Sequence, residues 1–144
     1  MTMENQTFQN KEDKTNTCET VTFGTNVKLI TCNAIMTISG DGMKPLYSNG
    51  DMVLVSYCDT INEGEIGVFD CPESGRIVRY KGKTGLYSLN PDFDRKPLSE
   101  ESTVAIGKVL CKLTHDMILT LKDWQGYKKL IGNKKKTELV INSD

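Results

Sequence analysis

The sequence predicts a mostly β domain, with its sheet folded over or closed into a partial barrel and one short helix near the C-terminus. Short apolar and β-branched runs recur along residues 27–113, with turn-forming residues about every eight to twelve positions. This spacing is typical of sandwiches and barrels. Beyond residue 121 the apolar side chains recur at near-helical spacing instead, which favours an amphipathic helix.

The first strands are predicted at residues 27–30 and 34–38, which are apolar and partly β-branched. Residues 39–42 (Ser-Gly-Asp-Gly) interrupt the run. Residues 43–47 then suggest a short helical turn, because a proline stands near its start. An Asn-Gly-Asp turn precedes the next predicted strand, residues 52–57.

Three further short strands are predicted at residues 66–69, 76–80 and 86–89. The last two are joined by a glycine-containing segment that indicates a hairpin. Residues 103–113 form the longest late strand. A helix over residues 122–131 follows from the spacing of four apolar residues: Trp124, Tyr127, Leu130 and Ile131.

The 144 residues fit one domain with appendages. Residues 1–26 are predicted to be a disordered N-terminal segment, because their polar start cannot offset the entropy of ordering. Residues 27–121 form the domain. Residues 122–144 form a Lys-rich C-terminal helix and tail, with six lysines against three acidic residues.

Composition argues against several kinds of partner and site. The net charge of −1 gives no reason to expect direct DNA or membrane binding. No apolar run approaches the roughly 18 residues of a membrane span, and the first 17 residues contain no secretory h-region. The five cysteines form no C-x-x-C pair, so neither metal nor disulfides are expected. We expect a cytoplasmic protein without cofactors.

One stretch carries the most informative motif. Residues 38–45 read Ile-Ser-Gly-Asp-Gly-Met-Lys-Pro, and residues 49–55 read Asn-Gly-Asp-Met-Val-Leu-Val. Both resemble the nucleophile region of the LexA/UmuD-like serine peptidases and, more distantly, of the type I signal peptidases. Four later pieces follow in the family's order, so the resemblance covers residues 34–113: residues 63–66, 76–80, 88–93 and 106–109.

The resemblance implies a LexA/signal-peptidase-like fold with a serine nucleophile and a lysine base. Such a lysine acts near neutral pH because apolar surroundings lower its pKa. The turn formed by Ser39, Gly40, Asp41, Gly42 and Met43 would line the cleft as an oxyanion-like loop. Backbone N–H groups in a glycine-bracketed turn can face an incoming carbonyl.

Both catalytic positions are degenerate in this chain. Gly42 stands where the family has its serine. The lysine position falls on Val78 or, one residue later, on Arg79, which stays protonated and cannot serve as a base. Lys81 and Lys83 follow closely, but neither supplies a nucleophile. The Ala-Gly and Cys-Gly dipeptides at which family repressors cut themselves do not occur. No catalytic residue is therefore expected.

Other side chains offer weaker alternatives. Ser39 lies three residues before the serine position and should point elsewhere. A pair between His115 and one of three cysteines is conceivable, although no spacing favours it: Cys32, Cys58 and Cys71. Asp41 and Asp51 lie in turns, where carboxylates accept backbone N–H bonds, so we expect them to stabilise those turns.

Two functions remain open. In the first, the chain is a pseudoenzyme that acts as a regulatory or protein-binding module, in a bacterial or phage/mobile-element context of transcription regulation such as the SOS response. It would bind a protein or peptide, pair with a full-length LexA-like repressor, or form a homodimer through residues 104–113, a long apolar strand that could otherwise leave an apolar patch or an open sheet edge. A monomer whose helix covers that strand is the alternative to the dimer. In the second, it is an active LexA/UmuD-type peptidase whose nucleophile was altered; a serine at position 42 of the native sequence would favour this.

Overall fold

The computed structural model describes residues 20–24, 29–93, 96–118, 121–132 and 140–143. Most strands belong to one seven-stranded sheet with the order β10-β4-β5-β9-β6-β7-β8. Its strands are β4 (Ala34–Ser39), β5 (Met52–Tyr57), β6 (Ile66–Cys71), β7 (Gly75–Lys81), β8 (Leu86–Tyr87), β9 (Val104–Lys112) and β10 (Val140–Asn142). Two short 3-10 helices, η1 (Glu100–Ser102) and η2 (His115–Ile118), flank β9.

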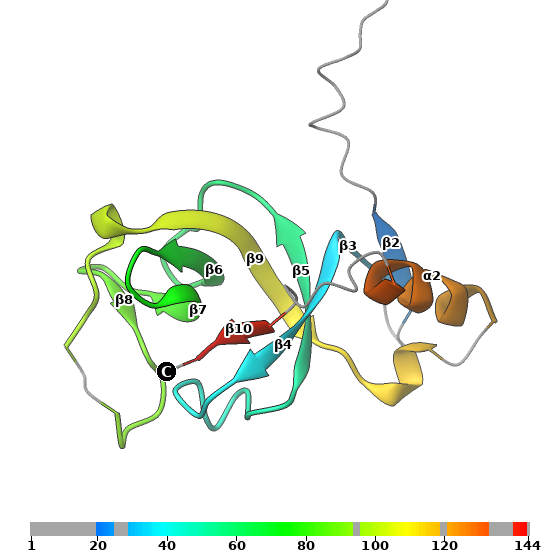
Figure 1. Ribbon diagram of the computed structural model, residues 1–144, viewed down its shortest axis with the longest axis horizontal. Coiled ribbons are helices and arrows are strands. Elements are labelled where there is room, and N and C mark those ends of the chain that lie inside the picture. The colour runs from blue at the N-terminus through cyan, green and yellow to red at the C-terminus, as the bar shows by residue number, and fades with distance from the viewer. Residues whose placement is uncertain (1–19, 25–28, 94–95, 119–120, 133–139, 144) are drawn as a thin grey trace, which may run out of the picture.

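Strand β10 closes this sheet into a barrel, because it pairs with both β4 and β7 (Figure 1). The four steps from β4 through β5, β9 and β6 to β7 are all antiparallel. An even number of reversals leaves β4 and β7 running in the same direction. A strand between them must therefore run parallel to both or antiparallel to both, and β10 is parallel to both.

A second, two-stranded sheet lies beside the barrel. It pairs β2 (Val21–Gly24) with β3 (Leu29–Cys32) in antiparallel fashion. Helix α2 (Leu121–Gly132) lies alongside β2 (Figure 1). The two elements approach closely at Gly126, where an added Cβ would lie 2.5 Å from a methyl group of Val21. Only a residue without a side chain lets the helix dock at this depth.

Three apolar clusters show how the barrel is packed. The closed ring of the barrel consists of β4, β5, β6, β7, β9 and β10, because β10 pairs with β7 and leaves β8 outside. The first cluster takes residues from each of these strands and fills the interior: Ala34, Met36, Ile38, Met43, Tyr47, Val53, Val55, Val68, Val78, Val109 and Ile141. The second joins the opposite face of β4 and β5 to β2, β3, η2 and α2: Phe23, Cys32, Ile35, Leu54, Met117 and Leu130. The third covers the opposite face of β6 and β7: Ile61, Phe69, Cys71, Ile77 and Leu86. Period-two alternation along the strands produces this division.

The predicted fold class is confirmed: the described part of the chain is mostly β, with a closed sheet and a short helix near the C-terminus. The predicted strands agree with the observed ones within a few residues, except that β8 is shorter than residues 86–89. Residues 42–46 form a turn at the place of the short helical turn predicted over residues 43–47. Tyr47 still donates its N–H to the Met43 carbonyl oxygen, at 3.0 Å.

Ordered structure extends outside the predicted domain limits of residues 27 and 121. The N-terminal segment that was expected to be disordered contains strand β2. This strand is ordered because it pairs with β3 and its Phe23 is completely buried. Residues 1–19 of that segment lie outside the described residues. At the other end, the tail beyond residue 121 supplies strand β10, which belongs to the barrel.

The sheet order corrects the argument that led to the predicted homodimer. Strand β9 lies between β5 and β6 and is paired along both edges, so residues 104–113 do not leave an open sheet edge. Leu110 of β9 and the following Leu113 pack in the second cluster, which also includes Leu130 of α2, so the helix shares a core with this part of the chain without capping an edge. The homodimer stays a prediction that rests on the family resemblance.

No helix in the described part of the chain is long and apolar enough to cross a membrane.

Candidate functional site

The turn after β4 contains Gly42, the residue that the resemblance aligns with the family's serine. Gly40 adopts φ +100°, in the left-handed region that favours glycine, and its N–H donates to Asn49 Oδ1 at 2.8 Å. Gly42 is buried and begins the turn over residues 42–46. The chain thus reverses directly after the strand and directs backbone groups of Gly42 into the molecule.

Asn90 holds this turn in place. Its backbone N–H donates to the Gly42 carbonyl oxygen at 2.8 Å, and its side-chain amide donates to the Asp41 carbonyl oxygen at 2.9 Å. The side-chain oxygen accepts the N–H of Asp92, also at 2.9 Å. Asn90 is one of two buried polar residues among those described, and its hydrogen bonds explain why an amide is used there. It therefore fixes two successive peptide groups, Asp41–Gly42 and Gly42–Met43.

Val78 lies on β7 and is completely buried inside the barrel, in one cluster with Met43 and Ile141. The next residue, Arg79, is partly buried, and its guanidinium donates to the Val78 carbonyl oxygen at 2.9 Å. In either register, β7 carries a valine or an arginine at the position that the resemblance aligns with the family's lysine. A neutral amine is found at neither position.

Strand β10 occupies the space between the two strands that carry these positions. Asn142 is in register with Ser39 of β4 on one side and with Ile77 of β7 on the other. Two interstrand steps place β4 and β7 about 10 Å apart here. We call the facing edges of β4 and β7, together with the backbone of Gly42, the strand slot.

Ser143 anchors the end of β10 in the strand slot. It is completely buried. Its backbone N–H donates to the Ser39 carbonyl oxygen at 2.6 Å, and its hydroxyl donates to the same oxygen at 3.1 Å. The hydroxyl also accepts the N–H of Gly42 at 3.1 Å. The N–H that was expected to face an incoming carbonyl is thus bound to a serine of the same chain.

The other sequence candidates have structural partners. Lys81 donates to the Ile61 carbonyl oxygen at 2.8 Å and pairs with Glu100 at 3.0 Å, while Lys83 is exposed. The Asp51 carboxylate accepts the N–H of Ser48 at 2.9 Å, as expected for a turn residue. That of Asp41 forms an ion pair with Lys44 at 3.6 Å.

The hypothetical cysteine–histidine pair is not assembled. Burial raises the pKa of the Cys32 thiol to about 11, so this thiol stays protonated. The Cys58 thiol donates to the Thr60 carbonyl oxygen at 3.5 Å. His115 is exposed on η2 and lines a hollow beside Asp51 and Tyr127, whereas Cys71 lines a different one.

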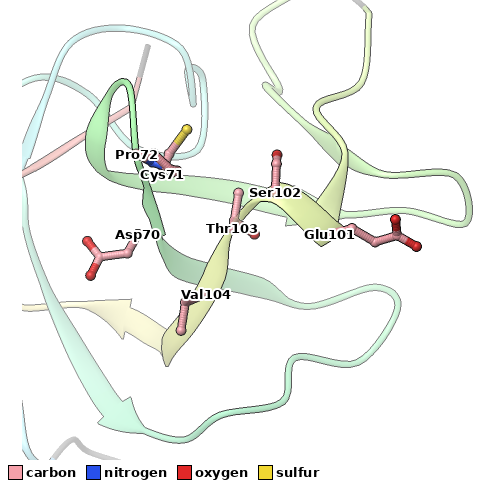
Figure 2. Close-up of a pocket in the computed structure, with 7 residues that line it drawn as sticks. All are labelled: Asp70, Cys71, Pro72, Glu101, Ser102, Thr103 and Val104. Atoms are coloured by element: carbon pink, nitrogen blue, oxygen red, sulfur yellow. The ribbon is translucent and has the colours of Figure 1, made fainter.

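The hollow that Cys71 lines contains several reactive side chains, but they do not face a common point. It has a volume of about 470 Å³ and lies between the β6–β7 turn and the start of β9: Asp70, Cys71, Pro72, Glu101, Ser102, Thr103 and Val104 line it. Backbone N–H groups of Glu73 and then Ser74 stabilise the Cys71 thiolate and lower its pKa. The side chains point in different directions (Figure 2), so the hollow does not bring a nucleophile, a base and an oxyanion site together.

Among the described residues, no group of three or more His, Cys, Asp or Glu side chains is arranged to hold a metal ion.

Sequence reasoning missed Ser143, β10 and the role of Asn90. A signal was present at the C-terminus, where the apolar run Leu139-Val140-Ile141 follows the lysine cluster and has strand propensity. Asn90 stood within a motif of the resemblance, but nothing local indicated that it binds the turn 49 residues earlier.

Comparison with known proteins supports the resemblance. A model of the family described as Peptidase S24-like matches residues 5–110, more than half of the chain. Comparison with curated proteins gives no match. The matched region ends before α2 and β10, so the strand that fills the slot comes from outside it. With its barrel and its LexA/UmuD-like motifs, the chain belongs to the peptidase S24-like family.

Proposed function

We propose that this chain is a catalytically inactive member of its family that serves as a regulatory, protein-binding module. The observation that carries the proposal is the pair of side chains at the two catalytic positions. Gly42 offers no hydroxyl, and the buried Val78 opposite offers no amine. Serine–lysine chemistry needs both groups, because the hydroxyl is a weak nucleophile until a base removes its proton.

Ser143 does not replace the missing nucleophile. Its hydroxyl lies beside the Gly42 N–H but donates to the Ser39 carbonyl oxygen, which cannot act as a base at neutral pH. The hydroxyl is also completely enclosed. A carbonyl carbon of a substrate has no access to it while β10 is in place.

Binding is supported by the backbone groups that the strand slot presents. Unpaired sheet edges recognise extended peptides through main-chain hydrogen bonds, and pockets for alternate side chains add specificity. Strand β10 uses the slot in this way, with Ile141 and Ser143 directed inward and Asn142 exposed. The proposed context is a bacterial or phage repressor system. Its partners would be a second copy of the chain, a full-length LexA-like repressor or another protein segment.

The test of inactivity is a time course of intact mass at about pH 10, where roughly 30% of lysine amines of ordinary pKa are neutral. Both the wild-type chain and the Gly42→Ser variant should keep their full mass, because a serine alone lacks a base. Time-dependent cleavage of the wild-type chain would establish the alternative, an active peptidase. Cleavage of Gly42→Ser alone would show that a base exists where we find none.

A further inference from the structure

The strand slot is occupied, and its occupant shows what it accepts. Strand β10 continues the sheet on both sides through Asn142. Ile141, with no exposed surface, packs into the barrel interior. Ser143 satisfies the Gly42 N–H and the Ser39 carbonyl oxygen. The slot therefore accommodates a branched aliphatic residue and, two positions later, a small residue with a hydroxyl group.

The degenerate catalytic positions are part of this recognition. Gly42 is buried, and its N–H meets the Ser143 hydroxyl directly. Val78 supplies an apolar contact in the cluster that contains Ile141, where a lysine would bring a charge into an apolar interior. The residues that replace a serine and a lysine are thus suited to holding a strand.

We propose that β10 is an exchangeable occupant of the strand slot. It blocks the slot in cis until a partner protein supplies an extended segment of the same pattern, a branched aliphatic residue followed two positions later by serine. This inference rests on the proposed function and adds its ligand class and its regulation. Because β10 competes with the partner for the slot, only molecules with an open slot can bind it. The apparent affinity for the partner is therefore reduced in proportion to the fraction of such molecules.

Attachment of β10 is limited to a short stretch, which favours exchange. Three residue pairs join it to β4 and one joins it to β7. Six pairs join β6 to β7 in the permanent part of the barrel. The side-chain amide of Asn142 adds a long hydrogen bond of 3.3 Å to the Ser74 carbonyl oxygen. A segment held by so few main-chain contacts opens more readily than the central strands.

The experiment uses the full chain and a fluorescent peptide with the sequence of residues 137–144. Ile141→Asp places a charge on the inward face of β10 and should release the strand. Asn142→Asp places the same charge on its exposed face and is the matched control. Fluorescence anisotropy should show that Ile141→Asp binds the peptide roughly tenfold or more tightly than the wild type or the control. A peptide with Asp in place of its isoleucine should bind to none of them.

A disulfide variant tests the same exchange without destabilising the fold. Ser39 and Asn142 are paired across β4 and β10, and neighbouring strands bring Cα atoms within the range of a disulfide. Oxidised Ser39→Cys/Asn142→Cys chain should lose the weak peptide binding that its reduced form shows. A disulfide formed between two chains would show that the slot takes β10 from a second copy, which would overturn exchange with a partner.

The outcomes separate this inference from the proposed function. If a folded Ile141→Asp chain does not bind the peptide and oxidation changes nothing, β10 is a permanent strand of the barrel and the inference fails. The mass of the peptide is measured after each titration. A cleaved peptide would instead refute catalytic inactivity, whether or not the strand exchanges.

Discussion

The strand slot and the hollow around Cys71 differ in the kind of group that each presents. The hollow holds a thiol of lowered pKa, two carboxylates and hydroxyls, but these side chains diverge (Figure 2). The slot holds almost no reactive side chain. Its polar groups are backbone atoms of Ser39 and Gly42, and they converge on the single buried residue Ser143.

We base the proposed site on this difference: the polar groups of the slot converge on one residue, whereas the hollow has more reactive side chains that do not converge. Buried backbone groups are costly to leave without hydrogen bonds, so a gap between two strands demands an occupant. An open hollow with exposed polar groups makes no such demand, because water satisfies them. Substitutions matched between the two regions test this distinction.

The largest expected effect comes from adding a lysine to each region. Val78→Lys should destabilise the fold by about 3–5 kcal/mol, because it buries a charge without a partner. Val104→Lys, at a position 67% exposed on the hollow, should change stability by less than about 0.5 kcal/mol. Urea denaturation of both variants measures the difference.

The pH dependence of Val78→Lys has a definite sign. Burial would depress the pKa of the new lysine in the folded state below its unfolded value of about 10.4. The unfolded state then binds the proton more readily, so the destabilisation should grow as pH falls below about 10. Equal losses of stability for the two lysine variants would contradict the assignment of Val78 to a closed interior.

A smaller effect is expected from removing one serine hydroxyl in each region. Ser143→Ala should cost about 1 kcal/mol, because it leaves the buried Gly42 N–H without its acceptor. Ser102→Ala removes an exposed hydrogen bond to the Ser99 carbonyl oxygen and should cost less than about 0.5 kcal/mol. Thermal denaturation of the two variants in parallel provides the measurement, and the reverse order would show that β10 does not need its serine anchor.

The smallest effect is a difference in rate and leaves stability unchanged. The thiolate is the reactive form of cysteine. Cys71, which is 8% exposed and lines the hollow, has a lowered pKa, whereas the pKa of Cys32, which is 1% exposed, is raised to about 11. Iodoacetamide at about pH 8 should therefore modify Cys71 well before Cys32, as peptide mapping by mass spectrometry would show. Faster labelling of Cys32 would mean that the second cluster opens in solution.

Local sequence pattern alone determined much of the secondary structure of this protein. The β-branched runs that became β4, β5, β7 and β9 were recognisable because strand propensity and turn residues act over a few positions. The glycine at position 42 and the valine and arginine at positions 78 and 79 are likewise read directly from the sequence.

Tertiary structure decided which strands meet. Strand β10 pairs Val140 with Thr37, and Ser143 binds Gly42 from 101 residues away. No short-range pattern encodes such a partner, because register across distant segments depends on which edges the rest of the sheet leaves unpaired. The same reason explains why β9 was mistaken for an edge strand. Its neighbours β5 and β6 pair with it along both edges, and no local pattern in residues 104–113 encodes which strands these are.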